Sequence, residues 1–280
     1  MISYFNGKYL DKSEISISPD DRGFLFGDGV YEVIRSYHGK LFCFNDHMER
    51  LNYSLSQLRI EFRELDKLEG ILNRIIHDNS LLDKDATLYI QITRGVYKRM
   101  LQFPSEPLKP TVYITPTIVD YDTDRQRTGI NAYTVADHRW DRCDIKSITL
   151  LANVLSHQEA IEKGGQIGIY TMNDLITEGT HTSVFAVKGG KVLTHPANQQ
   201  ILSSITRKVV TNLCSNLYID LIEHPIKIDD VYFVDELFIV GTTPEITPVV
   251  LLNDQKIGNG TPGKITQLLQ AEFRKLVDLL

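Results

Sequence analysis

The sequence predicts an α+β protein with two domains: a smaller N-terminal α/β domain and a larger C-terminal domain with a β-barrel-like core. Three observations lead to this prediction. The chain has 280 residues, which is enough for two hydrophobic cores. Apolar residues recur at helical spacing in two N-terminal segments. Further along, segments rich in β-branched residues alternate with helices but without strict βαβ regularity, which favours α+β over a parallel doubly wound sheet.

The N-terminal third alternates predicted hairpins and helices. Asn6-Gly7 lies between two short strand-like runs and is the strongest local hairpin signal. A second hairpin is predicted around His38-Gly39, from strands at 30–37 and 41–44, and Asn45 is expected to cap the helix that follows. The buried stripes of the two predicted helices are Met48, Leu51, Leu55 and Leu58, then Leu68, Ile71, Leu72, Ile75 and Ile76. Two further strands are expected at 86–93 and 111–118.

A polar segment at 119–127 carries no apolar period and is predicted to link an N-terminal domain at 1–118 to a C-terminal domain at 128–280. The strands expected in the second domain are 130–136, 167–172, 182–187, 191–194, 219–224, 236–241 and 246–251. The helices expected there are 148–163, 205–217 and a last one that carries Ile265, Leu268, Leu269, Leu276, Val277 and Leu280.

Composition and charge exclude several classes of function. The net charge of −6 comes from 36 acidic and 30 basic residues that are intermingled, so nucleic acid is not expected as a partner. We expect no secretory signal, and no apolar stretch approaches the ~18 residues needed to cross a bilayer. Three cysteines without metal-ligand spacing fit reduced thiols in the cytoplasm. Eight histidines show no HExxH or paired spacing, so no metal site is predicted, and no GxSxG motif supports a serine hydrolase.

Two short motifs are the strongest candidates for chemistry. Lys146 lies just ahead of a predicted helix, and Glu178 follows some thirty residues later in a Thr-Glu-Gly sequence. A lysine amine can form a Schiff base with an aldehyde, and a carboxylate can keep a pyridine nitrogen protonated. Each motif alone is weak, because a surface lysine and a solvated turn glutamate are the commoner interpretations. A lysine at the start of a helix, followed by a turn that carries a lone glutamate, suits an enzyme that uses pyridoxal 5′-phosphate (PLP).

The ordered set of motifs, from Asn6-Gly7 to Thr243, resembles the fold-type IV PLP-dependent enzymes. These are the D-amino acid transaminases, branched-chain aminotransferases and aminodeoxychorismate lyases. The resemblance implies the two-domain fold of this family. It also implies that Lys146 is the Schiff-base lysine, which acts as nucleophile and then as proton shuttle, and that Glu178 pairs with the ring nitrogen of the cofactor.

The resemblance further implies which residues hold PLP. Arg50 matches the cation that binds the phosphate, and a helix start supplies further phosphate contacts. The remaining cofactor-binding residues that it implies are Ile205 and Thr206 at that helix start, Thr242 for the phosphate, Leu202 against the ring face, and Arg139 on the side of the 3′-oxygen. Gly241 stands where family members often have serine.

Two segments, 21–35 and 93–104, indicate the substrate class, because they resemble the D-amino acid transaminase subgroup. Tyr31 and Arg99 match two residues that hold the substrate α-carboxylate there, the arginine reaching over from the neighbouring subunit. Leu101 replaces the histidine that completes this set, which could weaken carboxylate binding by ~1 kcal/mol. Thr243 is a further candidate for substrate binding.

The activity that we expect is transamination between a D-amino acid such as D-alanine and a 2-oxo acid such as 2-oxoglutarate. The resemblance implies a homodimer with active sites near the subunit interface. Alternatives within the family are a branched-chain L-aminotransferase, an (R)-amine transaminase and an aminodeoxychorismate lyase. A non-catalytic binding homologue is disfavoured, because Lys146, Glu178 and Arg50 are all present.

Overall fold

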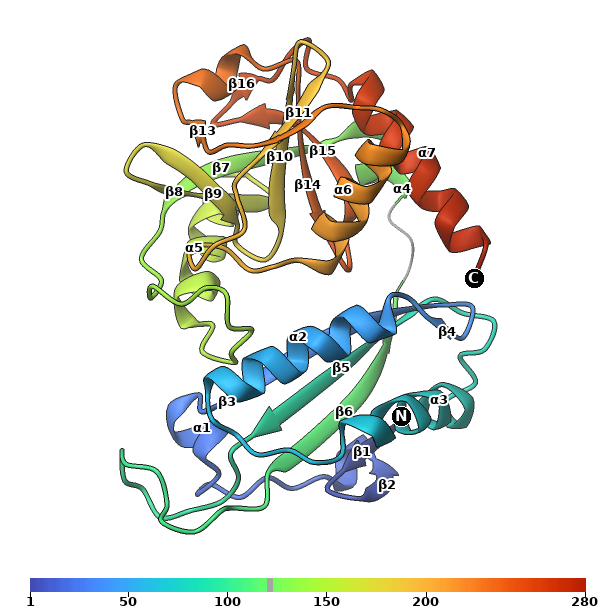
Figure 1. Cartoon of the computed structure of the whole chain (residues 1–280), viewed down its shortest axis with the longest axis vertical. Coiled ribbons are helices and arrows are strands. Elements are labelled where there is room, and N and C mark those ends of the chain that lie inside the picture. The colour runs from blue at the N-terminus through green and yellow to red at the C-terminus, as the bar shows by residue number, and fades with distance from the viewer. Residues whose placement is uncertain (120–122) are drawn as a thin grey trace. The chain divides into compact units, whose positions relative to one another are not determined.

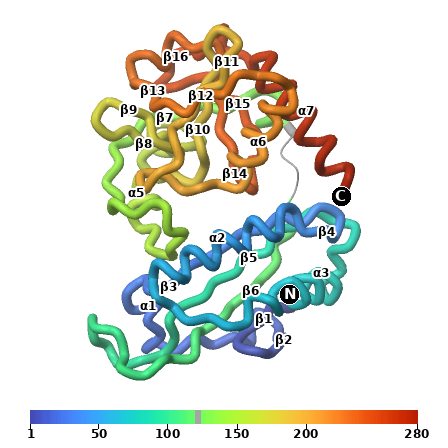
Figure 2. Tube along the Cα trace, in the orientation of Figure 1, coloured from blue at the N-terminus to red at the C-terminus, as the bar shows by residue number. Residues whose placement is uncertain are grey.

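The computed structural model describes residues 1–119 and 123–280 and divides into two compact units (Figures 1 and 2). Of the described residues, unit 1 comprises 1–119, Ile145–Leu150 and Leu280, and unit 2 comprises 123–144 and Leu151–Leu279. Each unit combines helices with a sheet, so the predicted α+β class is confirmed. The predicted linker at 119–127 includes 120–122, which lie outside the described residues, and the domain boundaries therefore stay a prediction.

Unit 1 is built on an antiparallel sheet whose described strands run in the order β2-β1-β6-β5-β3-β4. The predicted Asn6-Gly7 hairpin is confirmed: both residues have positive φ, +49° and +95°, and Phe5 pairs with Lys8. The strands are β1 (Ile2–Phe5), β2 (Lys8–Asp11), β3 (Gly29–Tyr37), β4 (Lys40–Leu41), β5 (Ala86–Thr93) and β6 (Thr111–Ile118). The helices are η1 (Lys12–Glu14), α1 (Arg22–Phe26), α2 (Phe44–Gln57), η2 (Leu65–Lys67) and α3 (Leu68–Asp78).

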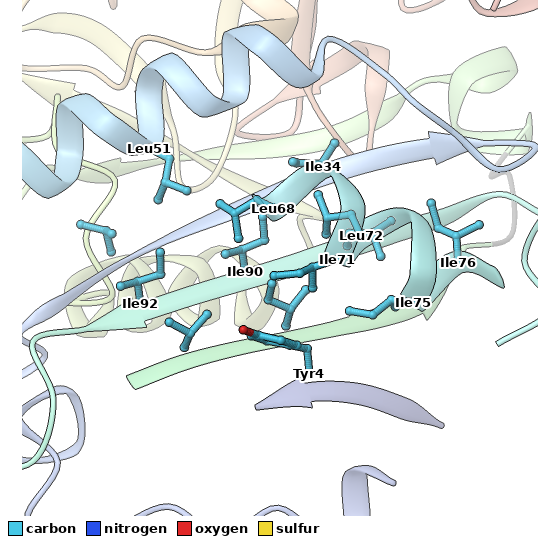
Figure 3. Packing of buried hydrophobic residues seen from close by; sticks show 14 of the residues in the cluster. Tyr4, Ile34, Leu51, Leu68, Ile71, Leu72, Ile75, Ile76, Ile90 and Ile92 are labelled. Atoms are coloured by element: carbon cyan, nitrogen blue, oxygen red, sulfur yellow. The ribbon is translucent and has the colours of Figure 1, made fainter. Parts of the chain in front are cut away.

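Helices α2 and α3 pack on one face of this sheet, as Figure 3 shows. Both predicted apolar stripes are confirmed, because their members lie in or against the core formed with Ile34 of β3 and Ile90 of β5. Two local predictions were wrong. The strand expected at 41–44 is limited to β4, and α2 begins at Phe44 after Cys43, whose φ is +52°, so Asn45 does not cap the helix.

Leu72 lies fully buried in this core (Figure 3), which allows a test of the packing. We expect Leu72→Ala to lower the free energy of unfolding by about 3 kcal/mol, because it removes buried apolar surface and leaves a cavity. Leu82 is 59% exposed, so Leu82→Ala should cost less than about 0.5 kcal/mol. Urea unfolding of both variants measures the difference. Equal losses would mean that the two leucines are not packed as described.

Unit 2 contains a larger, curled sheet. Its described strands run in the order β12-β11-β10-β14-β15-β7-β8-β9-β13, with β16 pairing β15. β9 and β10 lie side by side even though β14, β15, β7 and β8 separate them in this order, so the sheet curls into a barrel-like core. The strands are β7 (Ile130–Ala136), β8 (Ile167–Met172), β9 (Leu175–Gly179), β10 (Ser183–Lys188), β11 (Lys191–Thr194), β12 (Leu221–Glu223), β13 (Ile226–Lys227), β14 (Glu236–Gly241), β15 (Glu245–Leu252) and β16 (Gln255–Lys256).

The helices of unit 2 cover the outside of this sheet, and α6 packs against α7 (Figure 1). They are α4 (Thr123–Thr128), α5 (Leu151–Glu162), α6 (Ile205–Asn216), η3 (Asp230–Phe233) and α7 (Lys264–Asp278). The sequence reading missed α4 and β9. It also placed the start of α5 three residues too early, since Ser147 forms a bridge with Val30 of β3 and Ile148 hydrogen-bonds to Gly29. None of the helices in the described ranges is long and apolar enough to cross a bilayer.

Candidate active site

Lys146 belongs to unit 1, where its segment runs beside the start of β3. Its carbonyl accepts a hydrogen bond from the N–H of Tyr31 over 3.0 Å, and its own N–H donates to Ser54 Oγ on α2 over 3.1 Å. The Lys146 Nζ lies 4.1 Å from the centre of the Tyr31 ring. The strand edge and the helix therefore fix the backbone on both sides of the amine, and two of the predicted site residues lie in contact.

Arg50 lies on α2, one turn before Ser54, in a buried charged network. Its Nε and Nη2 donate to Glu32 Oε1 and Oε2 over 2.8 and 2.7 Å, and His47 Nδ1 lies 2.8 Å from Glu32 Oε2. Burial acts to raise the pKa of Glu32, but Arg50 and His47 hold it well below its usual range. Burial also lowers the pKa of His47, aided by the charges of Arg50 and Lys146. Glu32 is thus the anion that orients the Arg50 guanidinium.

Sequence reasoning did not single out Glu32 or His47. The available signal was the carboxylate of Glu32 among the apolar residues Val30, Val33 and Ile34 of a predicted strand, since a buried charge needs a partner of opposite charge. His47 and Arg50 are spaced three apart on the next helix, which places them on one face.

Arg99 and Leu101 lie between β5 and β6 on the surface of unit 1. The Leu101 side chain is 83% exposed. The guanidinium carbon of Arg99 lies 5.6 Å from the centre of the Phe26 ring. Arg99 is exposed, and its pairing with Tyr31 around a carboxylate stays a prediction.

Glu178 lies at the end of β9 in unit 2, where it is buried against Arg139. Arg139 Nη1 donates to Glu178 Oε1 over 2.6 Å, and the N–H of Leu202 donates to Oε2 over 3.1 Å. Asp137 accepts from Arg139 Nε and Nη2, and the Arg139 guanidinium stacks 4.1 Å above the ring of Tyr170. Burial raises the pKa of Glu178 to about 7, against the opposing effect of Arg139.

Three predicted residues, Glu178, Arg139 and Leu202, are therefore brought together in unit 2. Burial makes the ionised form of a carboxylate costly, and a second cationic donor stabilises that form, because the negative charge then has two partners. Asp137 and Tyr170, which sequence reasoning missed, hold Arg139 in place from the other side.

Leu202 leads directly into α6, whose first residues are Ile205 and Thr206. Ser204 caps this helix by accepting from the N–H of Arg207 over 3.2 Å. The N–H groups of Ile205 and Thr206 belong to the first turn of α6, where N–H groups have no carbonyl acceptor within the helix, and such a helix start favours an anion.

Thr242 and Thr243 lie in the turn between β14 and β15, where Thr242 is partly buried and Thr243 is exposed. A Cβ on Gly241 would come within 3.3 Å of Pro244 and 3.5 Å of the Thr182 methyl group, so this position has little room for a side chain. Thr182 Oγ1 and the adjacent Ser183 Oγ are buried and have no hydrogen-bond partner among the described residues. Such hydroxyls are rare in proteins and suit a bound group that carries hydrogen-bonding atoms.

Comparison with known proteins identifies the family. The family model described as amino-transferase class IV matches residues 29–252. The chain belongs to this family. It is 36% identical to the D-alanine aminotransferase of Staphylococcus haemolyticus over 98% of this chain and 97% of that protein. It is 37% identical to the D-alanine aminotransferase of Bacillus licheniformis, over 98% and 96%. The solved branched-chain amino acid aminotransferase of Escherichia coli superposes with a TM-score of 0.91 at 26% identity, over 99% and 94%.

This class IV aminotransferase is a PLP-dependent enzyme that acts on amino acids and 2-oxo acids. The residues present fit the cofactor. Unit 1 offers a lysine amine on a fixed backbone, and unit 2 offers a buried carboxylate that lacks a second cation. Unit 2 also has a capped helix start and unpaired hydroxyls next to a turn. In the described part of the chain, no group of three or more potential metal ligands occurs.

Proposed function

We propose that this aminotransferase moves the amino group of a D-amino acid, such as D-alanine, to a 2-oxo acid such as 2-oxoglutarate. The observation that carries the proposal is the identity of 34–37% to D-alanine aminotransferases over 98% of the chain. Tyr31, which lies against Lys146, and Arg99 supply donors for an α-carboxylate and support the same proposal.

A branched-chain L-aminotransferase is the second candidate, because solved enzymes of that name share the fold, at 26% identity in the example above. A panel of D-alanine, L-alanine and L-leucine with 2-oxoglutarate as acceptor separates the two candidates. The proposal predicts turnover of D-alanine at a kcat/KM at least roughly a hundredfold above that for either L-amino acid. If the enzyme turned over L-leucine but not D-alanine, the second candidate would replace the proposed function.

Unit 2 is proposed to hold most of the cofactor. When bound, PLP withdraws electrons from the Cα–H bond of the substrate amine. The Glu178 carboxylate would keep the ring nitrogen protonated, with Arg139 holding that carboxylate and lying on the 3′-oxygen side. Leu202 would pack against the ring face. The N–H groups of Ile205 and Thr206, with Thr242, would bind the phosphate.

Unit 1 is proposed to supply the reacting amine. Lys146 Nζ would hold the cofactor by condensing with its aldehyde with loss of water, and as a free amine it would serve as the general base for the proton on the substrate Cα. Arg50, oriented by Glu32, would bind the phosphate from this side. Tyr31 and Thr243 would line the substrate position.

We also propose a homodimer with active sites near the subunit interface, in the cytoplasm. Leu151, Val154 and Leu155 on α5 are 60–70% exposed, which leaves apolar surface that a second copy could cover. None of the three cysteines forms a disulfide within the described residues, as a reducing compartment favours. Sedimentation at micromolar concentration tests the dimer, and a monomeric active enzyme would contradict it.

The carboxylate role of Arg99 gives a direct prediction. Arg99→Ala should raise the KM for D-alanine roughly tenfold or more, since loss of a charge-assisted pair leaves only the neutral Tyr31 donor. Leu101→His should change this KM much less, and in the opposite direction, because it adds one donor and leaves the charge of Arg99 in place. An (R)-arylamine has no carboxylate, so its half-reaction should be nearly indifferent to Arg99→Ala. Half-reactions of both variants with both donors measure this, and equal losses for the two donors would mean that Arg99 supports the fold or the interface.

A further inference from the structure

One carboxylate in unit 1, that of Asp28, accepts hydrogen bonds from two buried arginines. Arg22 Nε donates to Oδ2 over 2.8 Å, and Arg94 Nε and Nη2 donate to Oδ2 and Oδ1 over 2.7 and 2.9 Å. Arg22 is only 3% exposed and Arg94 8%. Burial acts to raise the pKa of Asp28, but the two arginines outweigh it and lower that pKa. A single negative charge therefore faces two guanidinium groups.

Both arginines also hold the segment between β5 and β6 that carries Arg99. Arg22 Nη1 donates to the carbonyl of Met100 over 2.6 Å. The Arg94 guanidinium lies 3.8 Å from the centre of the Phe103 ring, a close cation–π contact. The first anchored residue, Met100, immediately follows Arg99, and the second, Phe103, comes three residues later. The arginines that hold them both pair with Asp28.

Backbone contacts fix the beginning of the same segment. The Arg22 N–H donates to Gly95 O over 2.9 Å, and the Tyr97 N–H donates to Asp20 O over 3.1 Å. Gly95 has a φ of +106°, and a Cβ there would come within 2.3 Å of Lys109 O, so only glycine fits. The backbone of the loop 95–103 is thus held at several points, while the Arg99 and Leu101 side chains stay exposed.

We propose that Asp28 is a positioning residue for substrate recognition. Through Arg22 and Arg94 it holds the loop 95–103 in the conformation that presents Arg99 to the substrate α-carboxylate. The inference rests on the proposed carboxylate role of Arg99. Its physical basis is preorganisation: a loop already ordered in the free enzyme does not pay its ordering entropy when the substrate binds. Asp28 itself contacts no substrate in this scheme.

Asp28→Asn in the PLP-loaded enzyme tests the proposal. We expect the KM for D-alanine to rise roughly tenfold while kcat stays within about twofold, because the variant loosens binding without touching the reacting amine. The matched control is Asp85→Asn, which removes the carboxylate from another buried arginine of unit 1, Arg35, at 3.1 Å and 1% exposure. The control should leave the KM within about twofold.

Phe103→Leu provides a second variant that keeps the buried charges intact. Phe103 is 46% exposed, so its replacement should not unfold the enzyme, yet it removes the ring from Arg94. It should raise the same KM about threefold. Faster amide hydrogen exchange at Gly95 and Tyr97 in both variants, with no change in Asp85→Asn, would show directly that the loop has loosened.

A double-mutant cycle with Arg99→Ala decides whether Asp28 acts through Arg99. In the Arg99→Ala background, Asp28→Asn should raise the KM by less than about twofold, since the group that it positions is gone. Additive losses, or unchanged exchange at Gly95 and Tyr97, would overturn the proposal. If the wild-type enzyme used L-leucine and not D-alanine, the proposed function would fail separately. The cycle and the exchange experiment would then be run with L-leucine, whose α-carboxylate is the same.

Discussion

Lys146→Ala is expected to fold, to bind PLP noncovalently, and to lose transamination by about 1,000-fold or more. The alanine removes both the nucleophile that bonds to the cofactor and the base that moves the Cα proton, and each of these functions is worth orders of magnitude in rate. Folding should survive, because the backbone at this position makes the contacts that fix the segment: its carbonyl to Tyr31 and its N–H to Ser54.

A labelling measurement and a control variant test this prediction. Borohydride reduction followed by mass spectrometry should add one pyridoxyl phosphate group to Lys146 of the wild-type enzyme and none to the variant. Lys163→Ala removes an exposed lysine that pairs with Glu159 on α5, and it should leave both turnover and labelling unchanged. Near-normal transamination by Lys146→Ala, or labelling at another lysine, would refute the assignment.

The helices and most strands of this enzyme could be predicted because their signals are local. The stripes of α2 and α3 repeat every three or four residues, and β5 and β6 begin and end where the composition of the sequence changes. The start of α5 could not be predicted in this way. The residues before it are held by Val30 and Gly29, more than a hundred positions away, and no window of the sequence contains that contact.

The candidate site shows the same division. Lys146, Glu178 and Arg50 were found from a motif order that resembles a family. Glu32, which orients Arg50, and Asp137, which holds the Arg139 that pairs with Glu178, come from elements whose pairing only the fold reveals. Glu178 lies near the end of β9, a strand that sequence analysis missed; β9 forms a hairpin with β8 and also pairs with β13, which lies far along the chain. Sequence pattern thus identified the groups with distinctive chemistry and missed the ordinary charged residues that orient them.

Glu178→Gln is expected to keep the fold and to slow the half-reaction with D-alanine on the order of 100-fold. A neutral amide keeps the shape of the carboxylate but cannot hold the ring nitrogen protonated. The variant therefore lacks the preorganised negative charge that lets the cofactor ring withdraw electrons from the substrate. The matched control is Asp137→Asn, which takes a carboxylate from the other side of the same arginine, Arg139. If the half-reaction rate fell by the same factor in both variants, the network around Arg139 and not the charge of Glu178 would explain the effect.

The cofactor-free enzyme gives a second, independent test of Glu178. Burial raises its pKa from 4.5 to about 7, so between these values the folded protein holds a proton that the unfolded chain has released. Raising the pH through this window therefore lowers the free energy of unfolding, and the loss is complete above pH 7. Glu178→Gln cannot titrate and should not show this component, so the stability of the variant relative to wild type should rise from pH 5 to pH 8. Urea unfolding of both cofactor-free proteins across that range measures it, and parallel pH profiles would mean that Glu178 is already ionised in the free enzyme.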